Sequence, residues 1–203
     1  MEENKIYYFI SDTHFGHSNI IRYCKRPFLK EGDLDSKGNW VSEYIASQRT
    51  KEMDETIIRN WNERIKDEDI VFFLGDWGFT KSTEAPDGQK FDNIRPLLRG
   101  NIVFIDGSHD KNNGCRTPIR NITIKHGGKN IFLVHDPKYI NKDIIWNFTG
   151  HIHGKYGKFR KQGKNIIVDL SVENWDYRPV DINEINQAYS EWCRRGCKEK
   201  REL

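Results

Sequence analysis

The chain has 203 residues, a length that suits one domain with a substantial core and is short for two. Its 33 Lys and Arg against 30 Asp and Glu leave a formal charge of +3, too near balance to indicate a dedicated nucleic-acid or anionic-membrane surface. Four cysteines without a disulfide framework or a complete zinc knuckle, and an N-terminus without the pattern of a signal peptide, predict a single cytoplasmic domain with no membrane segment.

Short runs rich in Ile, Val and Phe predict the strands of the chain. These runs cover residues 6–10, 70–74, 102–105, 131–134, 145–148 and 166–170. Apolar residues at helical spacing lie between the first two strands, at Met53, Ile57, Ile58, Trp61 and Ile65, and before the third, at Phe91, Ile94, Leu97 and Leu98. The alternation of strand and helix predicts a layered α/β fold.

The C-terminal part predicts one further helix. Asp181 with Glu184 three residues later resembles a capping box, and Gly196 lies near the expected end. The inward face consists of Ile182, Ile185, Tyr189 and Trp192. A charged tail follows from about residue 196. Residues 30–50 and 79–90 are polar and contain Gly without clear periodicity, so we expect loops or insertions there.

Two pairs of polar residues directly follow predicted strands. Asp12 and His14 flank one residue, and in an extended chain residues two apart point to the same side, where a carboxylate and an imidazole can share one ion. His151 and His153 repeat this spacing after Gly150, which lets the backbone pass close to a ligand. Ligands at the carboxyl ends of strands can converge in one crevice.

Three further segments carry residues of the same chemistry. They are Gly75-Asp76, Gly107-Ser108-His109-Asp110 and His135. Taken singly, each residue suits a helix cap, a turn or an ordinary core or surface position. Together they place five of the seven histidines in short motifs behind apolar strands, and this concentration predicts a metal centre.

The motif order D-x-H, G-D, G-S-H-D, H and G-H-x-H resembles that of the calcineurin-like metallophosphoesterase family from Asp12 to His153, which is most of the chain. The resemblance implies a four-layer α/β/β/α sandwich of two mixed sheets between helices, with the metal site at the carboxyl ends of the strands. It implies a metal-dependent phosphodiesterase or phosphomonoesterase.

The resemblance also assigns roles to individual residues. Asp12, His14 and His153 would bind the first metal ion, His135 and His151 the second, and Asp76 would bridge both. A hydroxide between the ions would attack the phosphorus, His109 would act as general acid, and Asp110 would orient its ring. The ligand types suit two divalent transition-metal ions, Mn above all, with Fe, Zn, Co or Ni as alternatives. Ser108 departs from the family, which has a metal-ligating Asn at this position.

The substrate is less well encoded. His17 and Arg22 are candidates for phosphate binding, and residues 30–50 are a candidate lid in which Trp40 would stack on a base or aryl group. No extended basic run with interleaved aromatics indicates a nuclease groove, which favours a small or nucleotide-like phosphoester over nucleic acid. The alternative is a metal-binding interaction module of the same fold whose catalysis is weak or lost because of Ser108.

Overall fold

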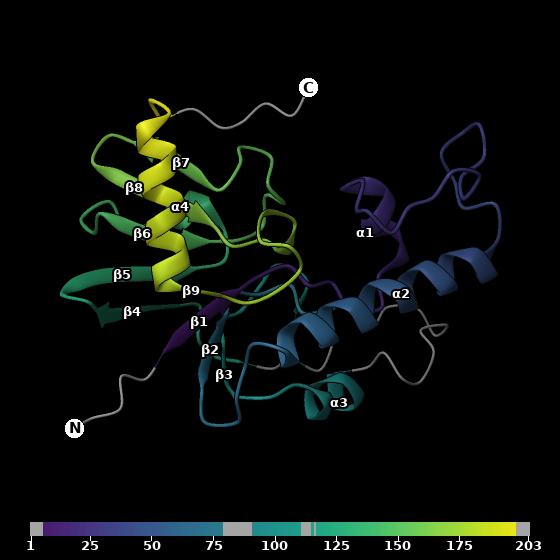
Figure 1. The fold of residues 1–203 in the computed structure, drawn as a ribbon, viewed down its shortest axis with the longest axis horizontal. Coiled ribbons are helices and arrows are strands. Elements are labelled where there is room, and N and C mark those ends of the chain that lie inside the picture. The colour runs from purple at the N-terminus through teal and green to yellow at the C-terminus, as the bar shows by residue number, and fades with distance from the viewer. Residues whose placement is uncertain (1–5, 79–90, 111–114, 116, 198–203) are drawn as a thin grey trace.

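The computed structural model describes residues 6–78, 91–110, 115 and 117–197. Its first sheet has the order β3-β2-β1-β9 (Figure 1). The strands are β1 (Tyr7–Ile10), β2 (Ile70–Phe73), β3 (Asn101–Phe104) and β9 (Val180–Asp181). The first three are parallel, and β9 runs antiparallel to β1. This sheet therefore brings the carboxyl ends of β1 and β2 to one edge.

The second sheet has the order β4-β5-β6-β8-β7. Its strands are β4 (Asn121–His126), β5 (Lys129–Val134), β6 (Trp146–Thr149), β7 (Phe159–Gln162) and β8 (Asn165–Asp169). The three central strands are parallel, and the outer strands β4 and β7 are antiparallel to their neighbours. β4 and β5 form a hairpin around Gly127 and Gly128, whose positive φ angles suit a two-residue turn.

The helices are few and lie at the flanks of the sheets. They are α1 (Ser18–Tyr23), α2 (Glu43–Asn62), α3 (Phe91–Ile94) and α4 (Ile182–Arg194), with short 3-10 turns η2 (Arg95–Leu97), η4 (Pro137–Tyr139) and η5 (Val172–Asn174). Within the described ranges, no helix is both long and apolar enough to cross a bilayer.

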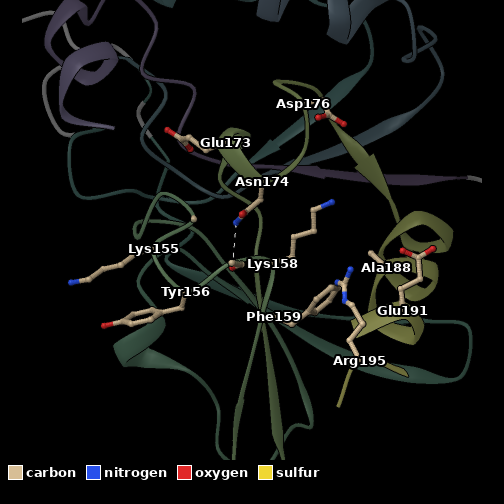
Figure 2. Close-up of a pocket in the computed structure, with 12 residues that line it drawn as sticks. Lys155, Tyr156, Lys158, Phe159, Glu173, Asn174, Asp176, Ala188, Glu191 and Arg195 are labelled. Carbon is tan, nitrogen blue, oxygen red and sulfur yellow. Dashed lines mark hydrogen bonds between the residues drawn. The ribbon is translucent and has the colours of Figure 1, made fainter. Parts of the chain in front are cut away.

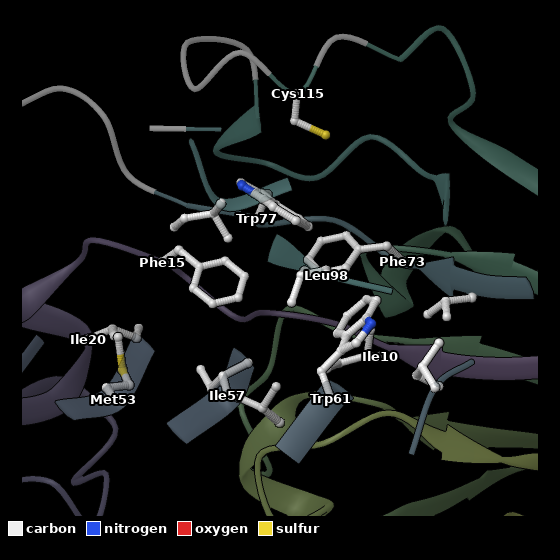
Figure 3. Packing of buried hydrophobic residues seen from close by; sticks show 14 of the residues in the cluster. Ile10, Phe15, Ile20, Met53, Ile57, Trp61, Phe73, Trp77, Leu98 and Cys115 are labelled. Atoms are coloured by element: carbon white, nitrogen blue, oxygen red, sulfur yellow. The ribbon is translucent and has the colours of Figure 1, made fainter. Parts of the chain in front are cut away.

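The protein has two apolar cores, because successive side chains of a strand point to opposite faces of its sheet. Tyr8 and Ile10 of β1 belong to the core that α1 and α2 cover with residues such as Met53 and Trp61 (Figure 3). Phe9 of β1 points the other way, into the core shared by the two sheets and α4. The predicted fold class, an α/β sandwich of two mixed sheets with flanking helices, is confirmed.

The six predicted strands and the capped helix α4 are confirmed, but three strands were not predicted. β4 and β7 are outer strands with alternating or mostly polar residues, and β9 has two residues, so none presents an apolar run. The helix predicted over Phe91–Leu98 ends at Ile94 and continues as a 3-10 turn because Pro96 lacks the N–H of an α-helical bond.

The prediction of a loop over residues 30–50 is wrong at its C-terminal end, where residues 43–50 are helical. The helix α2 begins at Glu43, where the Ser42 side chain accepts a hydrogen bond from the Ile45 N–H. Its first two turns are largely exposed, so they lack the apolar stripe that marks a helix in the sequence. The expected loop at 79–90 and the tail beyond residue 197 lie outside the described residues.

Candidate metal centre

The loops after β1, β2, β5 and β6 meet at one edge of the two sheets. Backbone bonds join them: the Asp12 N–H donates to Gly75 O at 3.0 Å, and the Gly150 N–H donates to His135 O at 2.9 Å. A side chain at Gly150 would not fit, since its Cβ would lie 2.0 Å from Ser11 Oγ and 2.3 Å from Asp12 Oδ2. Close backbone approach therefore explains this glycine.

Asp12, His14 and His153 form what we call the first triad, with one ligand atom of each within 4.8 Å of the others. Both imidazoles turn Nε2 toward the same carboxylate oxygen, because Asp12 Oδ1 lies 3.9 Å from His14 Nε2 and 3.7 Å from His153 Nε2. Asp12 is fully buried and His14 is 2% exposed. The first triad thus converges on a point shielded from bulk water.

Asp76, His135 and His151 form the second triad, whose ligand atoms also lie within 4.8 Å of one another. Asp76 Oδ2 is 3.3 Å from His135 Nε2 and 3.7 Å from His14 Nε2, so this one carboxylate reaches both triads. The rings of His135 and His151 meet edge to face with centroids 5.1 Å apart. Asp76 therefore lies between the two triads.

The donor atoms fit a cation. Both ring nitrogens of His14 are buried and accept or donate no hydrogen bond within the described part of the chain, an arrangement that costs free energy unless another group pairs with them. Burial holds the pKa of His14 well below its usual range, which keeps the ring neutral with a free lone pair. Histidine and carboxylate ligands suit a first-row transition metal.

Hydrogen bonds outside the triads fix the histidine tautomers. His135 Nδ1 donates to Leu74 O at 2.7 Å, which leaves Nε2 to face Asp76. Burial alone would lower the pKa of His135, but the hydrogen bond and charge of Asp76 raise it to about 9. The Asp76 carboxylate therefore favours a positive charge on the His135 ring.

The backbone at the centre is strained. Five of the six triad residues have a left-handed conformation that costs a non-glycine residue roughly 1–2 kcal/mol. The φ angles are 60° at Asp12, 50° at His14, 58° at Asp76, 73° at His151 and 49° at His153. Strain of this kind persists where the surrounding structure demands it, and it clusters at functional sites.

The segment with Ser108, His109 and Asp110 lies against the second triad. Ser108 Oγ is 3.1 Å from Asp76 Oδ2, and the His109 N–H donates to Asp76 Oδ1 at 2.8 Å. The His109 ring lies 5.6 Å from the His14 ring between centroids. The structure thus brings Ser108 and His109 to the centre.

The Asp110 carboxylate is occupied by backbone amides. It accepts hydrogen bonds from the N–H groups of Gly107, Asp76 and Trp77, each at 2.9 Å. These bonds shape the loops that carry the metal ligands, a role that the sequence did not indicate. Orientation of the His109 ring by Asp110 stays a prediction.

The three predicted substrate residues differ in their surroundings. The His17 ring lies 5.5 Å from the His14 ring, which places it at the centre. Arg22 donates to Gly38 O at 2.7 Å and so ties α1 to the following loop. Trp40 packs against the core beneath α1 and α2. Substrate contacts of these residues stay predictions.

The sequence did not indicate the polar residues behind the first triad. Ser171 Oγ lies 3.1 Å from Asp12 Oδ2 and 2.6 Å from Asp169 Oδ1, and Glu173 Oε1 lies 2.9 Å from His153 Nδ1. These residues lie in the run Asp-Leu-Ser-Val-Glu that begins at the last residue of β8, a strand end like the others, which is the one signal that points to them.

A cavity of about 700 Å³ adjoins the centre (Figure 2). The loop after His153, with Lys155 and Tyr156, lines one side, and α4 lines the other with Glu191. Glu173 lines the cavity and also contacts the candidate metal centre, because its carboxylate lies against Nδ1 of His153. The other ring nitrogen of His153, Nε2, faces Asp12. The described residues that line the cavity include no member of either triad, so the cavity approaches the centre through Glu173.

Comparison with known proteins extends this description. No family model matches the chain. The uncharacterized protein MJ1445 of Methanocaldococcus jannaschii is 36% identical over 191 residues, which cover 91% of each chain. The crystal structure of the protein of unknown function AQ665 from Aquifex aeolicus aligns with a TM-score of 0.61 and 22% identity, over 91% of this chain and 100% of that chain. The Escherichia coli phosphoesterase Yfce aligns with a TM-score of 0.39 and 14% identity, over 81% of this chain and 78% of that chain, too distantly to support an inference about chemistry.

Proposed function

The chain belongs to the family of the Methanocaldococcus jannaschii protein MJ1445, and we propose that it is a metal-dependent phosphoester hydrolase with a two-metal centre. One observation carries the proposal: two triads of histidine and carboxylate groups lie together at the convergence of four strand ends, and Asp76 of the second triad also lies 3.7 Å from His14 of the first. Asp12, His14 and His153 would hold one ion, His135 and His151 the other, and Asp76 both.

The expected ions are divalent transition metals, with Mn²⁺ favoured over Fe, Zn, Co or Ni. When bound, such ions would lower the pKa of a coordinated water molecule and would stabilise the charge of a phosphoryl group.

The protein's own residues supply positioning and proton transfer. Asp12 and Asp76 are buried and accept backbone hydrogen bonds from His151 and His109, which hold the carboxylates in place. His109 lies beside the first triad, where its ring can protonate the leaving alkoxide. The His17 ring lies 5.5 Å from the His14 ring between centroids and is a candidate contact of the phosphate.

The candidate site accounts for recognition of the phosphoryl group of a substrate but not of its alcohol. The centre binds a phosphoryl group and leaves the alcohol unspecified, so phosphodiesters and phosphomonoesters both remain candidates. The near-neutral charge favours a small or nucleotide-like ester over long nucleic acid.

The test compares the metal-free and the metal-loaded protein. Chelation should abolish hydrolysis of bis-p-nitrophenyl phosphate and p-nitrophenyl phosphate, and Mn²⁺ should restore it, with two ions per chain by elemental analysis. Asp76→Asn should lose metal and activity together, because it alters the carboxylate that lies between the two triads. Asp33→Asn is the matched control, since Asp33 is a buried carboxylate that pairs with Arg49 and belongs to neither triad.

Hydrolysis that survives complete removal of transition metals would contradict the proposal. Two bound ions without turnover of any ester would favour the alternative, an interaction module whose catalysis is lost at Ser108.

A further inference from the structure

Arg26 is a buried arginine that neither triad includes. It follows α1 and is 1% exposed. Its Nη1 donates to Thr13 O at 2.9 Å and its Nη2 to Asp12 O at 2.8 Å. These two carbonyls belong to the loop that carries the first triad's Asp12 and His14. One guanidinium thus clamps the backbone of this strained loop.

The same guanidinium binds a carboxylate from a distant segment. Arg26 Nε and Nη2 donate to Glu173 Oε1 at 2.9 and 2.7 Å, although the two residues are 147 positions apart in the chain. A guanidinium and a carboxylate removed from water are costly unless they pair closely, and here two N–H groups of Arg26 donate to the same oxygen, Glu173 Oε1. The pair is therefore rigidly placed.

Glu173 in turn orients His153, a residue of the first triad. The oxygen that Arg26 holds also lies 2.9 Å from His153 Nδ1. With its proton on Nδ1 and directed to Glu173, the imidazole presents the Nε2 lone pair toward Asp12, 3.7 Å away. Arg26 thus supports the first triad in two ways. It binds the Asp12 backbone directly, and it holds Glu173, which contacts His153.

The second triad has a separate support. His135 is oriented by the backbone carbonyl of Leu74, and Asp76 by the N–H of His109. Neither contact involves Arg26 or Glu173. The His151 N–H does donate to Asp12 Oδ2 at 2.9 Å, but the contacts that orient the His135 ring and the Asp76 carboxylate are independent of Arg26.

We propose that Arg26 is a positioning residue that sets the metal affinity of the first triad and leaves that of the second triad almost unchanged. The inference rests on the proposed two-metal centre. Loss of a hydrogen-bonded partner of a metal ligand commonly costs about 10- to 100-fold in metal affinity, so Arg26→Ala should weaken one of two binding steps by about that factor.

The experiment titrates metal-free protein with Co²⁺ and follows its visible absorption, which reports coordination independently of catalysis. His14→Ala and His135→Ala identify the steps of the first and the second triad. Arg26→Ala should weaken the first-triad step and change its spectrum. Millimolar guanidinium should restore part of this affinity, a rescue that a general loss of packing would not show.

Three further variants complete the design. Arg64→Ala is the matched control, because Arg64 pairs with Asp181 and Glu184 and contacts neither triad. Should Arg26→Ala fail to fold, Arg26→Lys and Glu173→Gln test the same connection, and both should weaken the first-triad step selectively.

If the wild type binds two Co²⁺ ions, an Arg26→Ala variant with unchanged Co²⁺ affinity, or with both binding steps weakened equally, would overturn the inference. A wild type that binds no Co²⁺ would instead remove the proposed metal centre itself, so the two failures are distinguishable.

Discussion

Substitution of Asp110 by Asn separates two roles of this buried carboxylate. Asp110 is 1% exposed, and its Oδ2 accepts from the N–H groups of Gly107 and Asp76 while its Oδ1 accepts from Trp77. An amide has one accepting oxygen, so Asn keeps at most two of these bonds and turns its NH₂ group toward the third donor. At least one buried N–H then loses its partner.

The expected cost follows from this count. A hydrogen bond to a charged group contributes about 1.5–3 kcal/mol, and at least one such bond is lost. For a chain of this size, 1 kcal/mol changes the melting temperature by about 2–4 °C. Asp110→Asn should therefore lower the Tm of the metal-free protein by about 3–12 °C.

The assay is thermal unfolding followed by circular dichroism in the presence of a chelator, so that metal binding does not contribute. Asp67→Asn is the control, because the Asp67 side chain is 88% exposed and should change Tm little. An unchanged Tm, with turnover lost only on esters with poor leaving groups, would refute this account and would show that Asp110 acts through His109.

Three further predictions concern catalysis. Ser108→Asn should lower the Mn²⁺ concentration for half-maximal activity about tenfold, because an amide oxygen reaches farther than the hydroxyl that now contacts Asp76; identical Mn²⁺ dependence with two ions bound in both forms would show that Ser108 is no handicap. His109→Ala should slow alkyl esters about 100-fold or more and nitrophenyl esters much less, with metal content retained; equal losses on both esters would argue against a general acid. Trp40→Ala should raise KM for nucleotide-like esters and spare small phosphates if residues 30–42 form a lid, and parallel changes in both KM values would leave Trp40 with its place in the core alone.

Local rules were sufficient for much of this protein. Apolar runs predicted the central strands because a strand buried on both faces is apolar along its whole length. The spacing in Asp12-x-His14 and His151-x-His153 predicted ligand pairs, and the structure brings both pairs to one centre, but the expected extended backbone was wrong: all four residues have positive φ angles, and His151 and His153 belong to different triads. The capping box at Asp181 predicted the start of α4, because its two hydrogen bonds join residues only three apart.

Other features required the tertiary structure. β4 and β7 became strands by pairing at sheet edges, where a half-exposed strand keeps polar residues and offers no apolar run. The Asp110 carboxylate meets N–H groups more than 30 residues away, and Arg26 meets Glu173 across 147 residues. Whether a charged side chain is a solvated surface group or the buried partner of a metal ligand depends on which distant segments exclude water around it. Periodicity and spacing carry no record of those contacts, so only the folded chain places Arg26 behind the metal centre.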